Sequence, residues 1–162
     1  MHLLRTLSFA TLAVLFSLIF IGGYVSASGV GLTCPNWPLC PHGFLPHWDF
    51  IIEYFHRSVA ATTSTLVITT MAFTLKSKGA PKGMKIASII AAGAVIGQVT
   101  LGGIVIVERL HAILVTALLG LGIVLFSMML IVTRYAFRIS SSKEINASST
   151  TSRRSNLSAR EH

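Results

Sequence analysis

Residues 86–107 read IASIIAAGAVIGQVTLGGIVIV, and no charged side chain interrupts this stretch. About 20 apolar residues in a helix cross the roughly 30 Å hydrocarbon core of a bilayer, because each residue advances the helix by about 1.5 Å. Further apolar runs lie at residues 6–25, 51–75 and 110–133. Lipid offers the backbone no hydrogen-bond partner, so each run is predicted to be a transmembrane helix. We therefore expect an all-α, multi-pass protein of the cell membrane, built as an antiparallel four-helix bundle.

The composition agrees with this class. Of the 162 residues, 52% are hydrophobic and 11% are charged. Soluble domains carry about 25% charged residues, and disordered chains hold far less apolar surface. The net charge of +8 also suits a nucleic-acid binder, but the cations lie between long apolar runs. The expected partner of these charges is therefore membrane lipid, with no nucleic acid.

The cations lie mostly on one side of the predicted bundle. Eleven of the 13 Lys and Arg residues fall before the first run, between the second and third, or after the fourth, which leaves Arg57 and Arg109 on the other side. The positive-inside rule then predicts that both termini are cytoplasmic. We expect a transmembrane domain over residues 1–137, with an outer loop over 26–50. Residues 138–162, rich in Ser, Thr and Arg, are expected to form a disordered cytoplasmic tail.

The first apolar run also has features of a secretory signal peptide. Arg5 precedes it, and Val25-Ser26-Ala27 near its end has the form of a cleavage site. The run is longer than the apolar part of a usual signal peptide, so we expect it to remain as a span. Its cleavage would leave the topology of the other three spans unchanged.

The predicted outer loop holds both cysteines of the chain, Cys34 and Cys40. A cysteine pair outside the membrane tends to be oxidised, so we expect a disulfide. It is either a structural link or a redox-active pair, since exposed disulfides are the labile ones. A zinc site completed by His42 and His47 is the alternative, which the spacing disfavours because zinc sites more often use C-x-x-C pairs and four ligands.

Two histidines lie at matched depth on predicted helices that run in the same direction. His56 is about one and a half turns into the second span, and His111 opens the fourth. Two imidazoles so placed can face each other across a bundle and bind the iron of a heme from both sides. The alternative is that both are interfacial residues at helix ends. Glycines on the first and third spans would let the backbone approach a large planar ligand: Gly22, Gly23, Gly93, Gly97, Gly102 and Gly103.

Each histidine also ends a Glu-x-x-His pattern, from Glu53 to His56 and from Glu108 to His111. Paired patterns of this kind are typical of di-iron proteins, which need a further glutamate from each of the other two helices. The first and third spans contain no Asp or Glu, which argues against a di-iron site within one chain.

The charged neighbours of these histidines have two interpretations each. Glu53 and Arg57 are four residues apart on a helix, which predicts a surface ion pair. Alternatively, Glu53 assists proton transfer during chemistry at the heme. Arg57 and Arg109 either bind heme propionates or face solvent.

The segments GGYVSASGVGLTCPNWPLCPHG (residues 22–43), EYFHRSVA (53–60) and GQVTLGGIVIV (97–107) resemble, with the histidine that follows, the heme A synthase family. The resemblance covers about residues 20–115. It is to the N-terminal of two similar four-helix halves, in the compact half-length form found in some archaea. It implies an oxidoreductase that oxidises the C8 methyl group of heme O to a formyl group, with oxygen from water, to make heme A for terminal oxidases.

The resemblance also implies roles for particular residues. The heme ligands of the family fall on His56 and His111, a glutamate important for activity on Glu53, and the cysteine pair on Cys34 and Cys40. The implied cofactor is heme b and the substrate is heme O, supplied by heme O synthase, with an electron acceptor that the sequence does not identify. Full-length members have two histidine pairs and this chain has one, so we expect a homo-oligomer.

Three other functions compete with this one. A non-catalytic membrane b-type cytochrome that passes electrons would need both histidines but not Glu53. A quinone-linked disulfide oxidase would need two cysteine pairs, and this chain has one. A structural membrane subunit would bind no heme.

Overall fold

The computed structural model describes residues 2–32, 51–109 and 111–158. The helices span His2–Ala27 (α1), Ile51–Lys76 (α2), Lys82–Val107 (α3) and Ala112–Ser158 (α4), and a short 3-10 turn spans Val30–Leu32 (η1). All four long helices have the length and apolar character needed to cross a membrane, and the described residues include no strand. The prediction of four membrane-spanning helices is confirmed.

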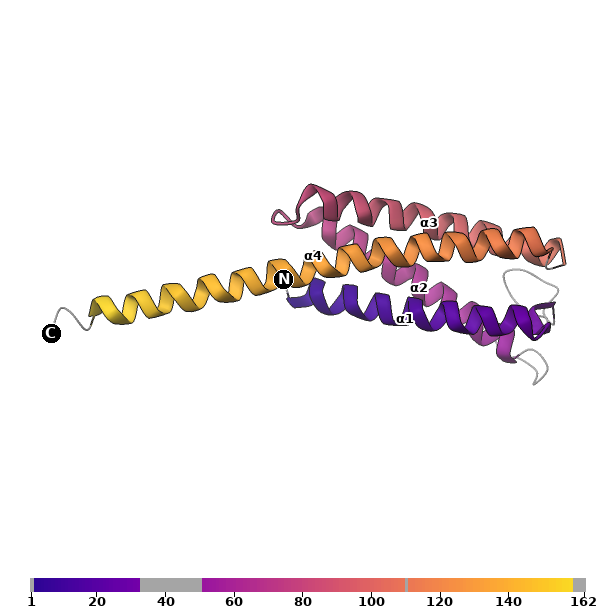
Figure 1. Cartoon of the computed structure of the whole chain (residues 1–162), viewed down its shortest axis with the longest axis horizontal. Helices are drawn as coiled ribbons and strands as arrows, with labels where there is room; N and C mark the ends of the chain where they lie inside the picture. Colours follow the sequence, from indigo (N-terminus) through magenta and orange to yellow (C-terminus); the bar gives the residue numbers. More distant parts are fainter. Residues whose placement is uncertain (1, 33–50, 110, 159–162) are drawn as a thin grey trace.

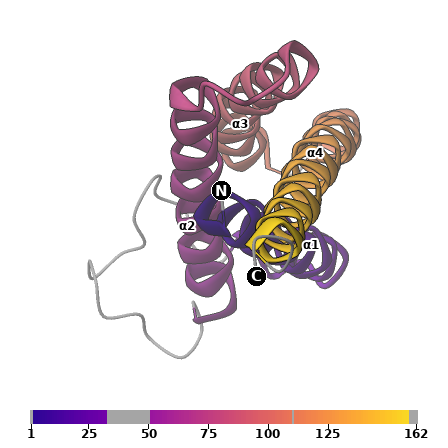
Figure 2. The same ribbon diagram turned by 90° about the vertical axis from the view of Figure 1, so that its left-hand side faces the viewer.

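The four long helices lie alongside one another, and successive helices are joined at alternate ends of the bundle (Figure 1). Helix α1 contacts α2 and α4, and α3 also contacts α2 and α4, so α2 and α4 lie on a diagonal of the bundle (Figure 2). Helices α2 and α4 begin at the same end, which we call the His56 end (Figure 1). Helix α3 begins at the opposite end, which we call the Lys82 end.

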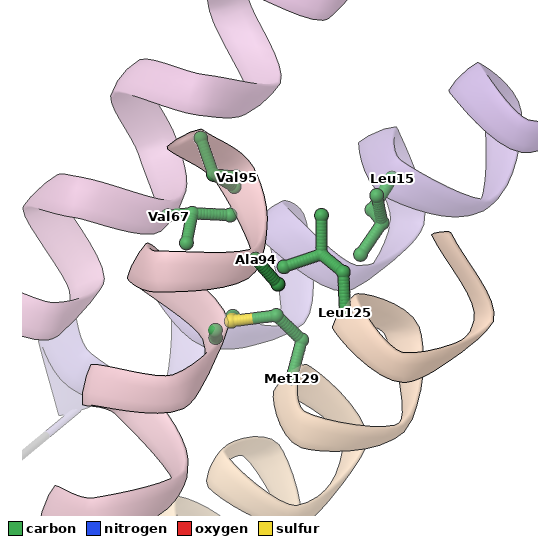
Figure 3. Close-up of a cluster of buried hydrophobic side chains, with 7 residues drawn as sticks. Leu15, Val67, Ala94, Val95, Leu125 and Met129 are labelled. Atoms are coloured by element: carbon green, nitrogen blue, oxygen red, sulfur yellow. The ribbon is translucent and has the colours of Figure 1, made fainter. Parts of the chain in front are cut away.

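Small and branched side chains from all four helices form the centre of the bundle. The cluster consists of Leu15, Val67, Ala91, Ala94, Val95, Leu125 and Met129, most of which are labelled in Figure 3. Lipid tails are as apolar as these side chains, so close packing and interhelical hydrogen bonds hold membrane helices together instead of the hydrophobic effect. Gln98 provides such a bond, because its Nε2 donates to the backbone oxygen of Leu118 at 3.0 Å and links α3 to α4.

Buried hydroxyl groups connect the helices nearer the Lys82 end. The hydroxyls of Thr11 and Thr70 lie 3.1 Å apart and link α1 to α2. Thr133 Oγ1 donates to the backbone oxygen of Ser8 at 3.2 Å and links α4 to α1. Each of the three hydroxyls also lies within hydrogen-bond distance of the carbonyl four residues earlier in its own helix. The helices are therefore joined here by polar groups that have partners inside the protein.

The sequence predicts a disordered tail from residue 138, whereas the structure has helix α4 in most of this segment. This helix continues to Ser158 and projects beyond the other three helices (Figure 1). Ile139 still packs against the bundle, and Ser140 is buried and accepts a 3.4 Å hydrogen bond from Arg5. A helix satisfies its own backbone, so it can extend past its last tertiary contact. The cytoplasmic location of this segment stays a prediction.

Candidate functional site

The His56 imidazole lies on the second turn of α2 and packs against α1. A Cβ atom on Gly22 would stand 3.1 Å from His56 Cε1, so the ring occupies space that the glycine leaves open. His56 Nδ1 is buried and makes no hydrogen bond within the described residues. A buried imidazole nitrogen without a partner is unfavourable unless a ligand or metal completes it. The imidazole is therefore held against α1 with one ring nitrogen that the described residues leave without a hydrogen bond.

Glu53 and Arg57 lie beside His56 on the same face of α2. Arg57 Nη2 is 2.5 Å from Glu53 Oε1, and the side chains are only 15% and 3% exposed, respectively. The predicted ion pair therefore forms, but it is largely buried and not on the surface. A buried carboxylate requires a charged or hydrogen-bonding partner, and the guanidinium supplies one. Because residues three apart are neighbours on a helix, the pair holds a carboxylate next to the imidazole.

The second predicted group lies in the short connection between α3 and α4. Glu108 directly follows α3 as its C-cap, with its N–H bonded to Ile104 O at 2.9 Å. Arg109 has a φ of 49°, the left-handed conformation in which helices commonly end. The carbonyl of His111 accepts hydrogen bonds from the N–H groups of Leu114 and Val115 and so starts α4. The side chains of Glu108, Arg109 and His111 are all exposed at the His56 end.

The structure thus brings together three of the predicted site residues, Glu53, His56 and Arg57. It places Arg109 and His111 at the same end of the bundle, but next to the start of α4, which lies diagonally opposite α2. Within residues 2–32, 51–109 and 111–158, no three His, Cys, Asp or Glu side chains are grouped closely enough to hold a metal ion. A bis-histidine heme requires only two protein ligands, so this finding does not bear on it. Cys34 and Cys40, the disulfide predicted for them, and the zinc alternative with His42 and His47 lie outside the described residues.

The glycines singled out in the sequence have different neighbours. Gly22 contacts His56, whereas Gly97 lies where a Cβ would come within 2.9 Å of Leu121 Cδ2 on α4. Gly23, Gly93 and Gly102 have no atom within 4 Å of a Cβ placed on them. The sequence did not distinguish Gly22 from Gly23, and the signal that separates them is the direction each faces on α1.

The residues fit a heme in their chemistry. His56 offers a ring with an unsatisfied nitrogen, and His111 offers an exposed ring at the same end of the bundle. Arg57 and Arg109 supply guanidinium groups of the kind that bind carboxylates such as heme propionates. Neither of these cations lies at the Lys82 end with the other described Lys and Arg residues.

Comparison with known proteins gives consistent matches. Residues 45–159 match the COX15-CtaA family, described as cytochrome oxidase assembly protein. The chain is 30% identical over 137 residues to a heme A synthase of Bacillus licheniformis, which covers 83% of this chain and 45% of that protein. It is 27% identical over 136 residues to a heme A synthase of Symbiobacterium thermophilum, which covers 82% of this chain and 44% of the relative. The chain therefore spans less than half the length of the curated relatives it matches.

Proposed function

Because the chain is a multi-pass membrane protein that belongs to the COX15-CtaA family of cytochrome oxidase assembly proteins, we propose that it acts as a heme A synthase. In this role it oxidises the C8 methyl group of heme O to a formyl group, with oxygen from water. The observation that carries this function is the environment of His56. Its ring packs into the space above Gly22 with a buried nitrogen that no described residue hydrogen-bonds.

In this function the protein holds heme at the His56 end of the bundle. His56 and His111 would provide the axial nitrogens, and Arg57 and Arg109 would bind propionates. Heme b as the cofactor supplies reversible electron transfer, and heme O is the substrate. Glu53 has its carboxylate fixed by Arg57 one turn from His56, and it would take up a proton released as the methyl group is oxidised. The electrons would pass to a separate electron acceptor.

The single histidine pair bears on the assembly of the protein. His56 and His111 could hold one heme, and we propose that copies associate into a homo-oligomer, each with one such pair. Substrate would come from heme O synthase in the same membrane. Crosslinking of the protein in native membranes, followed by denaturing electrophoresis, tests the oligomer, because a chain that stays monomeric across all crosslinker lengths would contradict it.

The proposed orientation is antiparallel, with both termini cytoplasmic and the cysteine loop outside. A membrane-impermeant maleimide should then label Cys34 and Cys40 in intact cells only after reduction of their disulfide. In a Cys34→Ser/Cys40→Ser background, Lys78→Cys should react only after the cells are opened. Labelling of Lys78→Cys in intact cells would show that the protein has the opposite orientation in the membrane.

Heme extraction tests the function directly. The chain is co-expressed with a heme O synthase, and the extracted hemes are identified by mass. The native sequence is expected to yield formyl heme, and Glu53→Gln is expected to accumulate heme O. Glu108→Gln is the matched control, because Glu108 occupies the other Glu-x-x-His pattern but is exposed. Formyl heme at native levels from Glu53→Gln would remove the proposed role of Glu53.

Spectroscopy of the bound heme, together with the heme extraction, distinguishes a heme A synthase from a b-type cytochrome. His56→Ala and His111→Ala should each lose the low-spin bis-histidine spectrum. Native protein that shows this spectrum but forms no formyl heme from supplied heme O would indicate an electron-passing cytochrome. Native protein that binds no heme would indicate a structural subunit.

A further inference from the structure

An open pocket lies on the surface of α4 toward the Lys82 end. It has a volume of about 210 Å³ and is lined by Ile131, Arg134, Tyr135 and Arg138. These positions follow the i, i+3, i+4, i+7 pattern and so share one face of the helix. Both arginine side chains are exposed, and in the described part of the chain neither guanidinium makes a hydrogen bond or an ion pair. The pocket therefore presents two positive charges that the bundle itself does not use.

Tyr135 shows the level of this pocket along the bundle. Its hydroxyl oxygen lies 3.0 Å from the position that a Cβ would take on Gly83, the second residue of α3. The pocket is therefore level with the start of α3, where Lys82 flanks that glycine. On α4, Arg134 is the first charged residue after the uncharged residues 112–133. From this change in the sequence we infer that the boundary between hydrocarbon and head groups crosses the bundle at this level, with Ile131 on the apolar side and both arginines on the polar side.

The described side chains at this end carry positive charge only. The cations are Arg5, Lys76, Lys78, Lys82, Lys85, Arg134 and Arg138. The two carboxylates whose side chains are described, Glu53 and Glu108, lie at the His56 end. Arg5 is engaged within the protein, because it donates to Ser140 and lies 5.5 Å from the centre of the Phe137 ring. Among the described side chains none at this end is acidic, so within that set an anion that approaches Arg134 and Arg138 meets no competing carboxylate.

We propose that this pocket binds the head group of an anionic phospholipid. The phosphate would lie between Arg134 and Arg138, whose planar guanidinium groups suit phosphate oxygens, with the Tyr135 hydroxyl beside them. The start of the acyl chains would lie along Ile131. A soluble anion would use only the charged half of the pocket, whereas a phospholipid satisfies the charged and the apolar halves together. Clusters of Lys and Arg that directly follow a membrane helix are a known setting for anionic lipids.

Lipid titration followed by native mass spectrometry tests the pocket. The purified full chain in detergent is titrated with phosphatidylglycerol and with phosphatidylcholine of the same acyl chains. We expect preferential binding of one phosphatidylglycerol. Arg134→Gln/Arg138→Gln should weaken phosphatidylglycerol binding by about tenfold or more, since each cation near a membrane surface contributes about fivefold. Phosphatidylcholine binding should not change.

The matched control is Lys76→Gln/Lys78→Gln, which removes the same charge from the same end but outside the pocket. It should retain phosphatidylglycerol binding within about twofold. Equal loss in both double variants would show a diffuse charge effect and overturn the pocket. Displacement of the lipid by millimolar inorganic phosphate would assign the pocket to a soluble anion and also overturn the lipid proposal.

A second variant protects the test against misfolding. Arg134→Lys/Arg138→Lys keeps the charge but removes the paired guanidinium donors, so its affinity should fall between those of the native and glutamine forms. Circular dichroism and gel filtration identify any variant that fails to fold. If the glutamine variant fails, native affinity in the lysine variant overturns the proposed guanidinium site. None of these measurements depends on heme or on the His56 end.

Discussion

The imidazole of His56 lies against Gly22, with 3.1 Å between His56 Cε1 and the position that a Cβ would occupy on residue 22. The contact joins α2 to α1 and sets the position of the ring that the proposed heme would use. Gly23, the next residue, has no atom within 4 Å of its own Cβ position. Two adjacent glycines thus differ in what a larger side chain would displace, and that difference can be measured.

Gly22→Val should move the imidazole of His56 and reduce heme binding. A Cβ at 3.1 Å already requires the ring to shift, and the two γ-methyl groups of valine enlarge the conflict. We expect most of the bound heme to be lost, and the low-spin signal in electron paramagnetic resonance to change. Gly23→Val carries the same helix-propensity change and should retain heme. Unchanged spectra in Gly22→Val would show that the ring in contact with Gly22 is not an iron ligand.

Arg57→Met should destabilise the protein strongly. The substitution removes the guanidinium bound to a carboxylate that is 3% exposed, and loss of one partner of a buried ion pair costs about 3 kcal/mol. Arg109→Met removes an exposed cation at the same end and should change stability by about 0.5 kcal/mol or less. Unfolding of both variants in detergent, followed by circular dichroism, gives the comparison. Equal stability of the two variants would contradict burial of the pair.

Gly122→Ala should be less stable than Gly120→Ala by about 1 kcal/mol. Both changes gain about 1 kcal/mol of helix propensity, but a Cβ on Gly122 would lie 2.9 Å from Gln98 Nε2. The glutamine would have to move and give up its bond to Leu118 O, worth about 1 kcal/mol. Gly120 has no atom within 4 Å of its Cβ position. The free energy of unfolding of the two variants in the same detergent checks this, and a more stable Gly122→Ala would refute the contact.

Thr11 and Thr70 should show a small favourable coupling. Their hydroxyls are 3.1 Å apart and fully buried between α1 and α2. Interhelical hydrogen bonds in membrane proteins contribute about 0.6 kcal/mol on average, because each hydroxyl has alternative partners. A double-mutant cycle with Thr11→Val and Thr70→Val should give a coupling of about that size. Additive effects of the two substitutions would show that the hydroxyls do not interact.

The number of helices and their approximate bounds could be predicted from the sequence, because a membrane span must be about 20 apolar residues long and must satisfy its own backbone. The predicted run at 51–75 agrees with Ile51–Lys76. The fourth run, predicted to end at 133, lies in a helix that continues to Ser158. Hydropathy marks where the membrane ends, whereas a helix ends only where its backbone bonds stop, so the two limits differ.

The candidate site was only partly predictable. The Glu-x-x-His spacing places Glu53, His56 and Arg57 on one face of α2 whatever surrounds them. The sequence could not show that the Glu53–Arg57 pair is buried, nor that Gly22 and not Gly23 contacts His56. Both depend on how α1 and α2 are rotated about their own axes.

The linear order of residues by itself determined the membrane class, the four spans and the chemical groups available at each end of the bundle. Only the tertiary structure decided which faces of the helices meet, that α2 and α4 lie on a diagonal, and which glycine gives room to the imidazole of His56. The physical reason is that a membrane helix is apolar on every side. A soluble helix reveals its inner face by an apolar stripe, but here both lipid and core accept the same side chains. The rotation of each helix is therefore set by the fit of small residues and by a few polar contacts between helices.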